Sequence, residues 1–183
     1  ILSALVGSFL NVVIYRLPEM MKRQWRCECS DFLETKNPHE KKDSERFNLA
    51  FPNSQCPHCQ TAIKPWHNLP VLGYLLIKGK CANCKQPISP RYPIIEFVTA
   101  ALGGVIAWYF GASVDAILLL GFLWALVSLT MIDADEKLLP DSITLPLLWV
   151  GILIHINSSW LSSELLSQVS LSDSVLGAAA GYL

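Results

Sequence analysis

Long apolar blocks alternate with polar segments along the chain, and the lengths of the blocks predict membrane helices. A helix needs roughly 20 mostly apolar residues to cross a bilayer. The predicted spans cover residues 1–15, 93–110, 116–132, 143–156 and 174–183. The first block is short and begins without methionine, so we expect a span cut at its start, with a signal-peptide core as the alternative. We expect the last block to stop midway through a span, so that both ends of the chain are truncated.

The distribution of positive charge orients these predicted spans. Thirteen of the fourteen Lys and Arg residues lie between Arg16 and Arg91, and the fourteenth is Lys137. The loops on the other side contain no cation, so the positive-inside rule places residues 16–92 and Lys137 in the cytoplasm. A chain that is 52% hydrophobic and 16% charged agrees with this interpretation. The predicted fold class is an all-α polytopic membrane protein with one small cytoplasmic loop domain.

The cytoplasmic segment, residues 16–92, contains all six cysteines. Cys56 and Cys59 form one Cys-x-x-Cys knuckle, and Cys81 and Cys84 form a second one 21 residues later, a spacing close to that of zinc ribbons. Four thiolates can enclose one tetrahedral metal ion, and a loop poor in large apolar residues gains folding free energy from that ion. The sequence therefore predicts a structural zinc site, with a redox pair or reduced thiols as the alternatives.

Other polar residues of the loop carry weaker signals. Cys27 and Cys29 are interpreted as surface thiols, and His58 and His67 as exposed histidines, although either histidine can replace a sulfur ligand. Residues 19–50 mix both charge signs and predict a mobile or partly helical insert. No phosphate loop, dinucleotide fingerprint, serine elbow or nucleic-acid patch occurs in the sequence, so we expect no nucleic acid among the partners. Because the predicted spans are apolar, we expect membrane lipid among them.

The segment "MIDADEKLLPD", residues 131–141, places acidic side chains directly behind an apolar span. Asp133 is the nearest to the bilayer, where an ionisable residue is costly and often functional. Aspartic hydrolysis needs two carboxyl groups that share a proton. If the segment is one helix, Asp135 points to a different face from Asp133, and Asp141 lies about 12 Å further along the axis. A catalytic partner of Asp133 is therefore expected from a distant segment.

Taken together, these motifs resemble the bacterial type IV prepilin peptidases, aspartic peptidases of family A24. The resemblance runs from "GSFLNVVIYRLP" at Gly7 through "CPHC", "KPWHNLPVLGYL" and "GKCANCKQPISPRYPIIE" to "IDADEKLLPDSITLPLLW" and "GAAAGYL". Several motifs in the right order make it specific, and it covers nearly the whole chain apart from residues 19–50.

This resemblance implies a multi-pass enzyme of the bacterial inner membrane. Such an enzyme cuts the basic leader from type IV prepilins and type II secretion pseudopilins at the cytoplasmic face. It implies that Asp133 is the first catalytic aspartate, with supporting roles for Asp135 and Asp141. The family's second aspartate lies in a Gly-x-Gly-Asp motif that is absent from these 183 residues. We therefore expect the fragment alone to be inactive as a peptidase.

A second activity implied by the resemblance is N-methylation of the new N-terminal residue, with S-adenosylmethionine as donor. The resemblance associates this activity with the cytoplasmic loop, where the four knuckle cysteines match the family's tetracysteine site. Gly79 and Lys80 match the segment beside it. No sequence feature reveals a methyl-donor pocket independently, and the cysteines are expected to shape the loop.

Two further hypotheses come from other classes of protein. A non-enzymatic membrane scaffold that recruits partners through its zinc ribbon predicts that Asp133 is dispensable and that the cysteines are essential. A metal transporter predicts ligands within the spans, which contain almost none, and ranks last. Gly7, Gly103 and Gly104 are expected to allow close helix packing. Glu96 is expected either to lie at the membrane boundary or to serve the function.

Overall fold

The computed structural model describes residues 1–34, 46–56, 58–63, 66, 69–156 and 169–182. Its helices are α1 (Leu2–Phe32), α3 (Leu72–Leu76), α4 (Arg91–Phe110), α5 (Val114–Glu136), α6 (Asp141–Ile156) and α8 (Leu171–Tyr182). Two isolated antiparallel bridges are the only β pairing in the described ranges. The predicted class, a helical protein with a small cysteine-rich loop domain, is confirmed.

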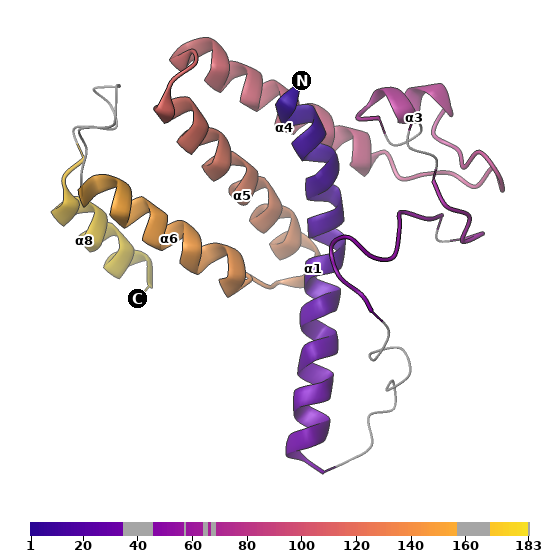
Figure 1. The fold of residues 1–183 in the computed structure, drawn as a ribbon, viewed down its shortest axis with the longest axis horizontal. Coiled ribbons are helices and arrows are strands. Elements are labelled where there is room, and N and C mark those ends of the chain that lie inside the picture. Colours follow the sequence, from indigo (N-terminus) through magenta and orange to yellow (C-terminus); the bar gives the residue numbers. More distant parts are fainter. Residues whose placement is uncertain (35–45, 57, 64–65, 67–68, 157–168, 183) are drawn as a thin grey trace.

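Helices α1, α4 and α5 pack against one another, and α6 with α8 forms a second pair that touches α5 (Figure 1). The chain directions follow from the contacts between α1 and the other two helices. The amide of Asn11 donates to the carbonyl of Tyr92 over 3.2 Å, whereas Gly103, at the other end of α4, faces Ser3. α1 and α4 are therefore antiparallel, and α5 returns in the direction of α1.

Two glycines allow the close approach of α1 to its neighbours. A Cβ at Gly7 would lie 3.0 Å from the Cα of Glu96, and one at Gly103 would lie 2.6 Å from the Cβ of Ser3. A Cβ at Gly104 would meet nothing within 4 Å. The prediction of close packing is therefore confirmed for Gly7 and Gly103 and wrong for Gly104, which lies on the open side of α4.

An apolar cluster joins the three helices near one end of the bundle. Leu10 and Ile14 of α1, Ile95 of α4 and Ile132 of α5 are buried there, and Ile132 is 0% exposed. Charged residues follow this cluster at the same end of the bundle on all three helices, at Arg16, Arg91 and Asp133, and the buried Glu96 lies beside Ile95. The cluster thus lies at the end of the bundle where the three helices become polar.

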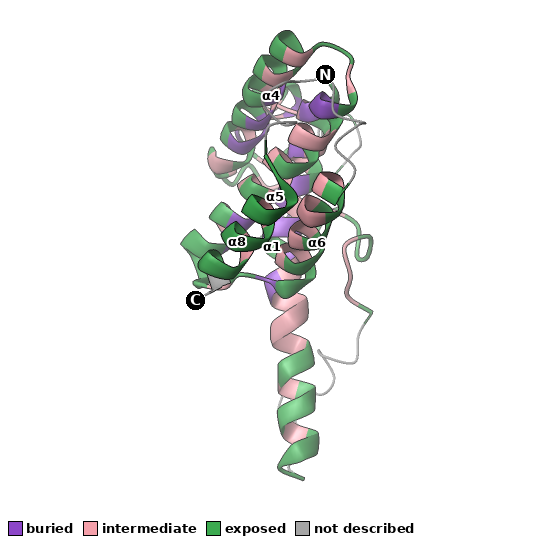
Figure 2. Ribbon diagram, turned by 90° about the vertical axis from the view of Figure 1, so that its left-hand side faces the viewer, coloured by how far each residue is buried: buried purple, intermediate pink, exposed green. Residues whose placement is uncertain are grey.

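Helix α1 continues well beyond the predicted span of residues 1–15. It has 31 residues, or about 46 Å at 1.5 Å per residue, and its second half projects from the bundle (Figure 2). Pro18 lies inside the helix and removes one backbone hydrogen bond. The helix nevertheless continues, because residues 19–32 suit a helix and form i,i+4 pairs such as Arg23 to Glu19 at 3.2 Å.

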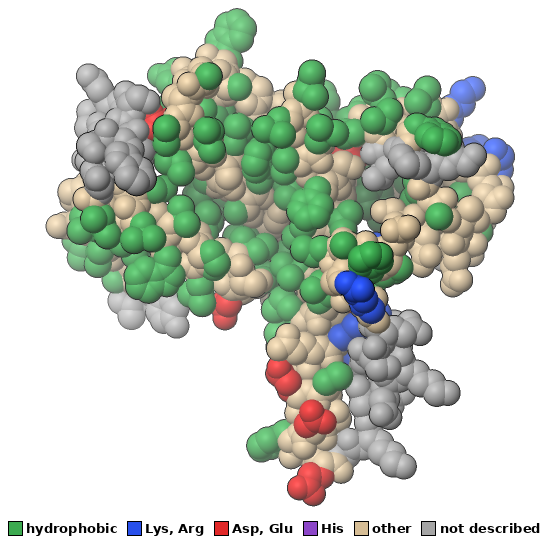
Figure 3. Space-filling view, viewed as in Figure 1, with side chains coloured by type: hydrophobic (Ala, Val, Ile, Leu, Met, Phe, Trp, Pro, Cys, Tyr) green, Lys and Arg blue, Asp and Glu red, His purple; other side chains and the backbone are tan. Residues whose placement is uncertain are grey.

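Helices α4 and α5 are long and apolar enough to cross a bilayer, whereas α6, with 16 residues, is shorter. Their outer faces carry exposed apolar side chains, among them Trp108, 91% exposed, and Ile117, 70% exposed. Figure 3 shows apolar atoms spread over most of the visible face of these helices. An apolar surface of this extent fits contact with lipid. The crossings proposed for residues 1–15, 143–156 and 174–183 stay predictions.

The adjacent glycines of α4 provide a matched test of helix packing. Gly103→Ala is expected to lower the free energy of unfolding by about 1–3 kcal/mol, because its Cβ meets the Ser3 side chain. Gly104→Ala is expected to be neutral or slightly stabilising, because that position is open and alanine favours a helix. Thermal unfolding of both variants in detergent measures the difference. Equal melting temperatures would contradict the observed packing of α1 on α4.

Candidate active site and metal centre

The two Cys-x-x-Cys knuckles are copies of one hydrogen-bonded unit, 25 residues apart along the chain. In residues 54–63 and again in residues 79–88, the first cysteine donates its N–H to the carbonyl five residues ahead and accepts from the N–H four residues ahead. Each unit is closed by one antiparallel bridge and by one further backbone hydrogen bond. Ile63 donates this bond in the first unit and Ile88 donates it in the second. The fourth residue after each first cysteine, Gln60 or Lys85, has a positive φ. Each knuckle therefore turns both of its sulfurs to one side.

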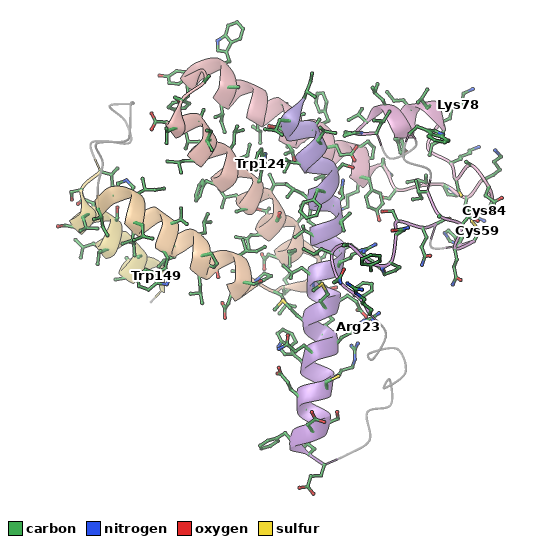
Figure 4. The ribbon with its side chains drawn as sticks, viewed as in Figure 1. Arg23, Cys59, Lys78, Cys84, Trp124 and Trp149 are labelled. Atoms are coloured by element: carbon green, nitrogen blue, oxygen red, sulfur yellow. The ribbon has the colours of Figure 1, made fainter. Side chains whose placement is uncertain are left out.

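The four sulfurs meet between the knuckles. The Sγ atoms of Cys56 and Cys84 are 3.8 Å apart, those of Cys59 and Cys81 are 3.9 Å apart, and all four lie within 4.8 Å of one another. Figure 4 shows Cys59 and Cys84 side by side at the outer end of the loop domain. With zinc–sulfur bonds of about 2.3 Å, a regular tetrahedron has its corners about 3.8 Å apart. The donor set therefore fits zinc, and the cysteines are free rather than paired in disulfides.

Hydrogen bonds and neighbouring sulfurs shift the pKa values of the thiols in different directions. The hydroxyl and backbone of Thr61, together with the Asn83 amide, lower the pKa of Cys59 to about 5. The backbone N–H of Gln86 lowers the pKa of Cys84, but burial and the three neighbouring sulfurs raise it to about 11. The thiols of Cys59 and Cys84 are therefore shifted in opposite directions, Cys59 toward the thiolate and Cys84 toward the protonated form. A divalent cation would allow all four to be thiolates, which is the chemistry of a structural zinc site.

The other candidate ligands lie outside this cluster. His58 is exposed and does not belong to the four-sulfur group, and His67 lies outside the described residues. Cys27 and Cys29 are exposed on the projecting part of α1, as the sequence predicted. The Asn83 amide donates to the Thr61 hydroxyl over 3.0 Å and joins the two knuckles. Sequence reasoning missed this pair, because its members are 22 residues apart and neither residue type is diagnostic.

Gly79 and Lys80 precede the second knuckle directly. Gly79 is buried and has φ +66°, a conformation that favours glycine, and a Cβ there would lie 2.7 Å from the Tyr74 hydroxyl. The Tyr74 side chain therefore fills the space beside Gly79, and the association of Gly79 and Lys80 with methylation stays a prediction. Lys80 is exposed and forms the bridge with Pro87 that closes the knuckle.

The acidic segment is not a single helix. α5 ends at Glu136, where Lys137 adopts the left-handed conformation and donates its N–H to the carbonyl of Asp133 over 2.9 Å. After a short link, α6 begins at Asp141. The predicted axial spacing between Asp133 and Asp141 is therefore wrong, because the two residues lie on different helices. Asp133 and Asp135, two positions apart on α5, do point in different directions, as a helix requires.

Two of the three carboxylates in the last turn of α5 are paired with cations. The Arg91 guanidinium donates two hydrogen bonds to Asp135, of 2.7 and 2.6 Å, and Lys22 contacts Glu136 at 2.6 Å. The Asp133 side chain is exposed, and within the described ranges it has neither a cation nor a hydrogen-bond donor. Asp133 is thus the carboxylate of this turn that is left available for a ligand.

Glu96 is buried in the second turn of α4 rather than placed at a boundary with solvent. Its carboxylate accepts a 2.7 Å hydrogen bond from the N–H of Val71, which has φ +58°, an unusual conformation for a β-branched residue. Glu96 therefore ties the loop domain to α4. Arg91 and Lys22 were not singled out in the sequence, since charges near a membrane boundary do not reveal their partners on other helices.

Comparison with known proteins supplies the context for these two sites. The bacterial Peptidase A24 N-terminal domain matches residues 1–110, and the Type IV leader peptidase family matches residues 118–183. Over all of its residues, the chain is 48% identical to a prepilin leader peptidase/N-methyltransferase of Pseudomonas putida and 44% identical to one of Pseudomonas aeruginosa. It covers 59% of each relative. No solved structure matches the chain.

The fold and the sites define an integral membrane protein with an acidic helix end and a tetracysteine loop domain. The chain belongs to the type IV leader peptidase family, peptidase family A24. It spans about 60% of the length of the curated relatives that it matches.

Metal analysis tests the cysteine cluster. Cys56→Ser is expected to reduce the zinc content of the protein, purified in detergent, from about one ion per chain to nearly none, because a structural site needs all four ligands. Cys27→Ser is the matched control and should keep its zinc, since Cys27 is exposed on α1. Plasma mass spectrometry on both variants gives the ratio. Full metal content in Cys56→Ser would rule out Cys56 as a ligand.

Proposed function

We propose that this chain carries part of a membrane-embedded aspartic endopeptidase of the bacterial inner membrane. The enzyme removes the basic leader from type IV prepilins and type II secretion pseudopilins at the cytoplasmic face. The names of the relatives, prepilin leader peptidase/N-methyltransferase, support this activity. The placement of residues 16–92 in the cytoplasm rests on the thirteen cations between Arg16 and Arg91.

The proposal rests on the position and the exposure of the Asp133 carboxylate. Its carboxylate is exposed one residue beyond the fully buried Ile132, at the end of a helix that is able to span a membrane. The neighbouring carboxylates of Asp135 and Glu136 are already paired with cations. A carboxylate left available at the polar boundary of the bundle is suited to meet a peptide bond that lies at the same depth.

The proposed chemistry is that of an aspartic peptidase. One carboxylate removes a proton from water while a protonated carboxyl polarises the scissile carbonyl, and the leaving amine is then protonated. Asp133 is assigned to one of these two roles. Asp135 is paired with Arg91, and Asp141 begins another helix, so both are proposed to support the site. The second carboxylate is proposed to come from the part of the relatives that these 183 residues do not span.

The surroundings of Asp133 fit a substrate that has an apolar helix and a basic leader. The apolar helix is proposed to pack among the membrane helices, whose outer faces are apolar. The leader stays on the cytoplasmic side, where the acidic end of α5 and Asp141 at the start of α6 attract positive charge. This arrangement brings the scissile bond to the depth of Asp133.

N-methylation of the newly exposed N-terminus is proposed as the second activity, with S-adenosylmethionine as the donor. The tetracysteine loop domain is proposed to support it. Zinc, when bound, would hold Cys56, Cys59, Cys81 and Cys84 together and so fix the two knuckles. The contribution of Gly79 is proposed to be indirect, because Tyr74 packs against it and the second knuckle starts there.

The indirect role of Gly79 can be tested against a direct contact with the donor. Gly79→Ala is expected to lower both methylation and zinc content, since the new Cβ meets Tyr74 and the left-handed conformation disfavours alanine. Adding Tyr74→Leu to Gly79→Ala should restore part of the zinc by removing the contact. Methyl transfer from labelled donor and metal analysis are the two measurements. Full zinc content together with lost methylation would instead indicate a direct contact.

The assignment of Asp133 is tested in the full-length protein. Asp133→Asn is expected to abolish prepilin cleavage, because the amide can neither remove nor store the catalytic proton. Asp31→Asn, which changes an exposed aspartate of α1, should cleave normally. Processing is followed by a gel shift. Normal cleavage by Asp133→Asn would refute the assignment and favour a scaffold, in which Asp133 is dispensable.

A further inference from the structure

The ion pair between Arg91 and Asp135 connects the start of α4 to the end of α5, two residues from Asp133. Both guanidinium nitrogens Nη1 and Nη2 donate to the carboxylate, one to each oxygen, over 2.7 and 2.6 Å. Such two-point pairing fixes orientation as well as distance, which a single contact does not. The last turn of α5 is therefore held in direction as well as in place.

Each charge of this pair stands at a helix end whose dipole favours the opposite charge. Arg91 is the first residue of α4, where the helix dipole favours a negative charge, and Asp135 is in the last turn of α5, where it favours a positive one. Exchanging the two residues would suit both helices better. Helix stability alone therefore does not explain why these two charges stand at these two positions.

Both partners are themselves anchored. Tyr92, the residue after Arg91, accepts a hydrogen bond from the amide of Asn11, which fixes the start of α4 on α1. On α5, Ile132 is fully buried in the apolar cluster, and the carbonyl of Asp133 accepts the N–H of Lys137. Asp133 thus lies in a turn that is fixed by apolar packing on one side and by Arg91 on the other.

We propose that Arg91 is a positioning residue of the peptidase: by holding Asp135, it orients the last turn of α5 so that Asp133 faces the scissile bond. The inference rests on the proposed function, since it assumes that Asp133 is catalytic. It assigns to Asp135 the role of a structural partner that does not touch substrate. It also gives the loop domain a mechanical link to the active site, because Arg91 follows the second knuckle by seven residues.

Kinetics of the full-length protein on a purified prepilin in detergent tests the proposal. Arg91→Gln is expected to lower kcat roughly ten- to hundredfold with an unchanged KM, as misplacement of a catalytic group does. Asp135→Asn should give the same loss, and the double variant should lose no more than either single one, because both changes break one contact. The exchanged pair, Arg91→Asp with Asp135→Arg, should regain most of kcat, because it restores the contact and suits both helix dipoles.

Controls separate this proposal from the others. Lys78→Gln removes an exposed cation of the loop domain and should keep wild-type kinetics, and Figure 4 shows Lys78 pointing away from the bundle. Unchanged kcat in Arg91→Gln, with Asp133→Asn inactive, would overturn the positioning role and leave the proposed function standing. A raised KM alone, or an exchanged pair that folds but stays inactive, would also overturn it. Normal cleavage by Asp133→Asn would instead refute the proposed function itself.

Discussion

The packing of α1 between α4 and α5 is the contact on which both candidate sites depend. Leu10, Ile14, Ile95 and Ile132 bury their side chains together at one end of the bundle. Neighbouring residues on a helix point about 100° apart, so burying Ile132 turns Asp133 toward the edge of the interface. The depth and direction of the proposed catalytic carboxylate are therefore consequences of apolar packing, and a change in that packing would move it.

Polar contacts attach the loop domain to the same end of the bundle. The buried Arg16 guanidinium donates to three backbone carbonyls between Asn48 and Pro52, and Glu96 accepts the N–H of Val71. A buried charge is tolerated only when it is well hydrogen-bonded, so these contacts fix the loop firmly. The loop domain is therefore attached to the end of the bundle at which α1 enters its polar half and α4 begins.

Local motifs were predictable from the sequence, and contacts between distant segments were not. The tetracysteine cluster follows from two short spacings, and Asp133 stood out because an apolar run ends directly before it. Residues 19–50 were predicted to be mobile or partly helical, but the unbroken continuation of α1 to Phe32 was not, since Pro18 and mixed charges look like a boundary while i,i+4 pairs sustain the helix. The pairing of Arg91 with Asp135 spans 44 residues, and only the packing of α4 on α5 brings the two together.

The charges around the last turn of α5 explain why one carboxylate stays available. The end of a helix is already partly negative, and this turn carries three acidic residues, so pairing two of them with cations lowers the repulsion within the turn. Arg91 and Lys22 neutralise the two that point toward α4 and α1. The remaining negative charge is concentrated on Asp133, where a basic leader and the peptide bond behind it would be drawn. Pairing of its neighbours thus leaves Asp133 as the carboxylate of this turn that is available for a ligand.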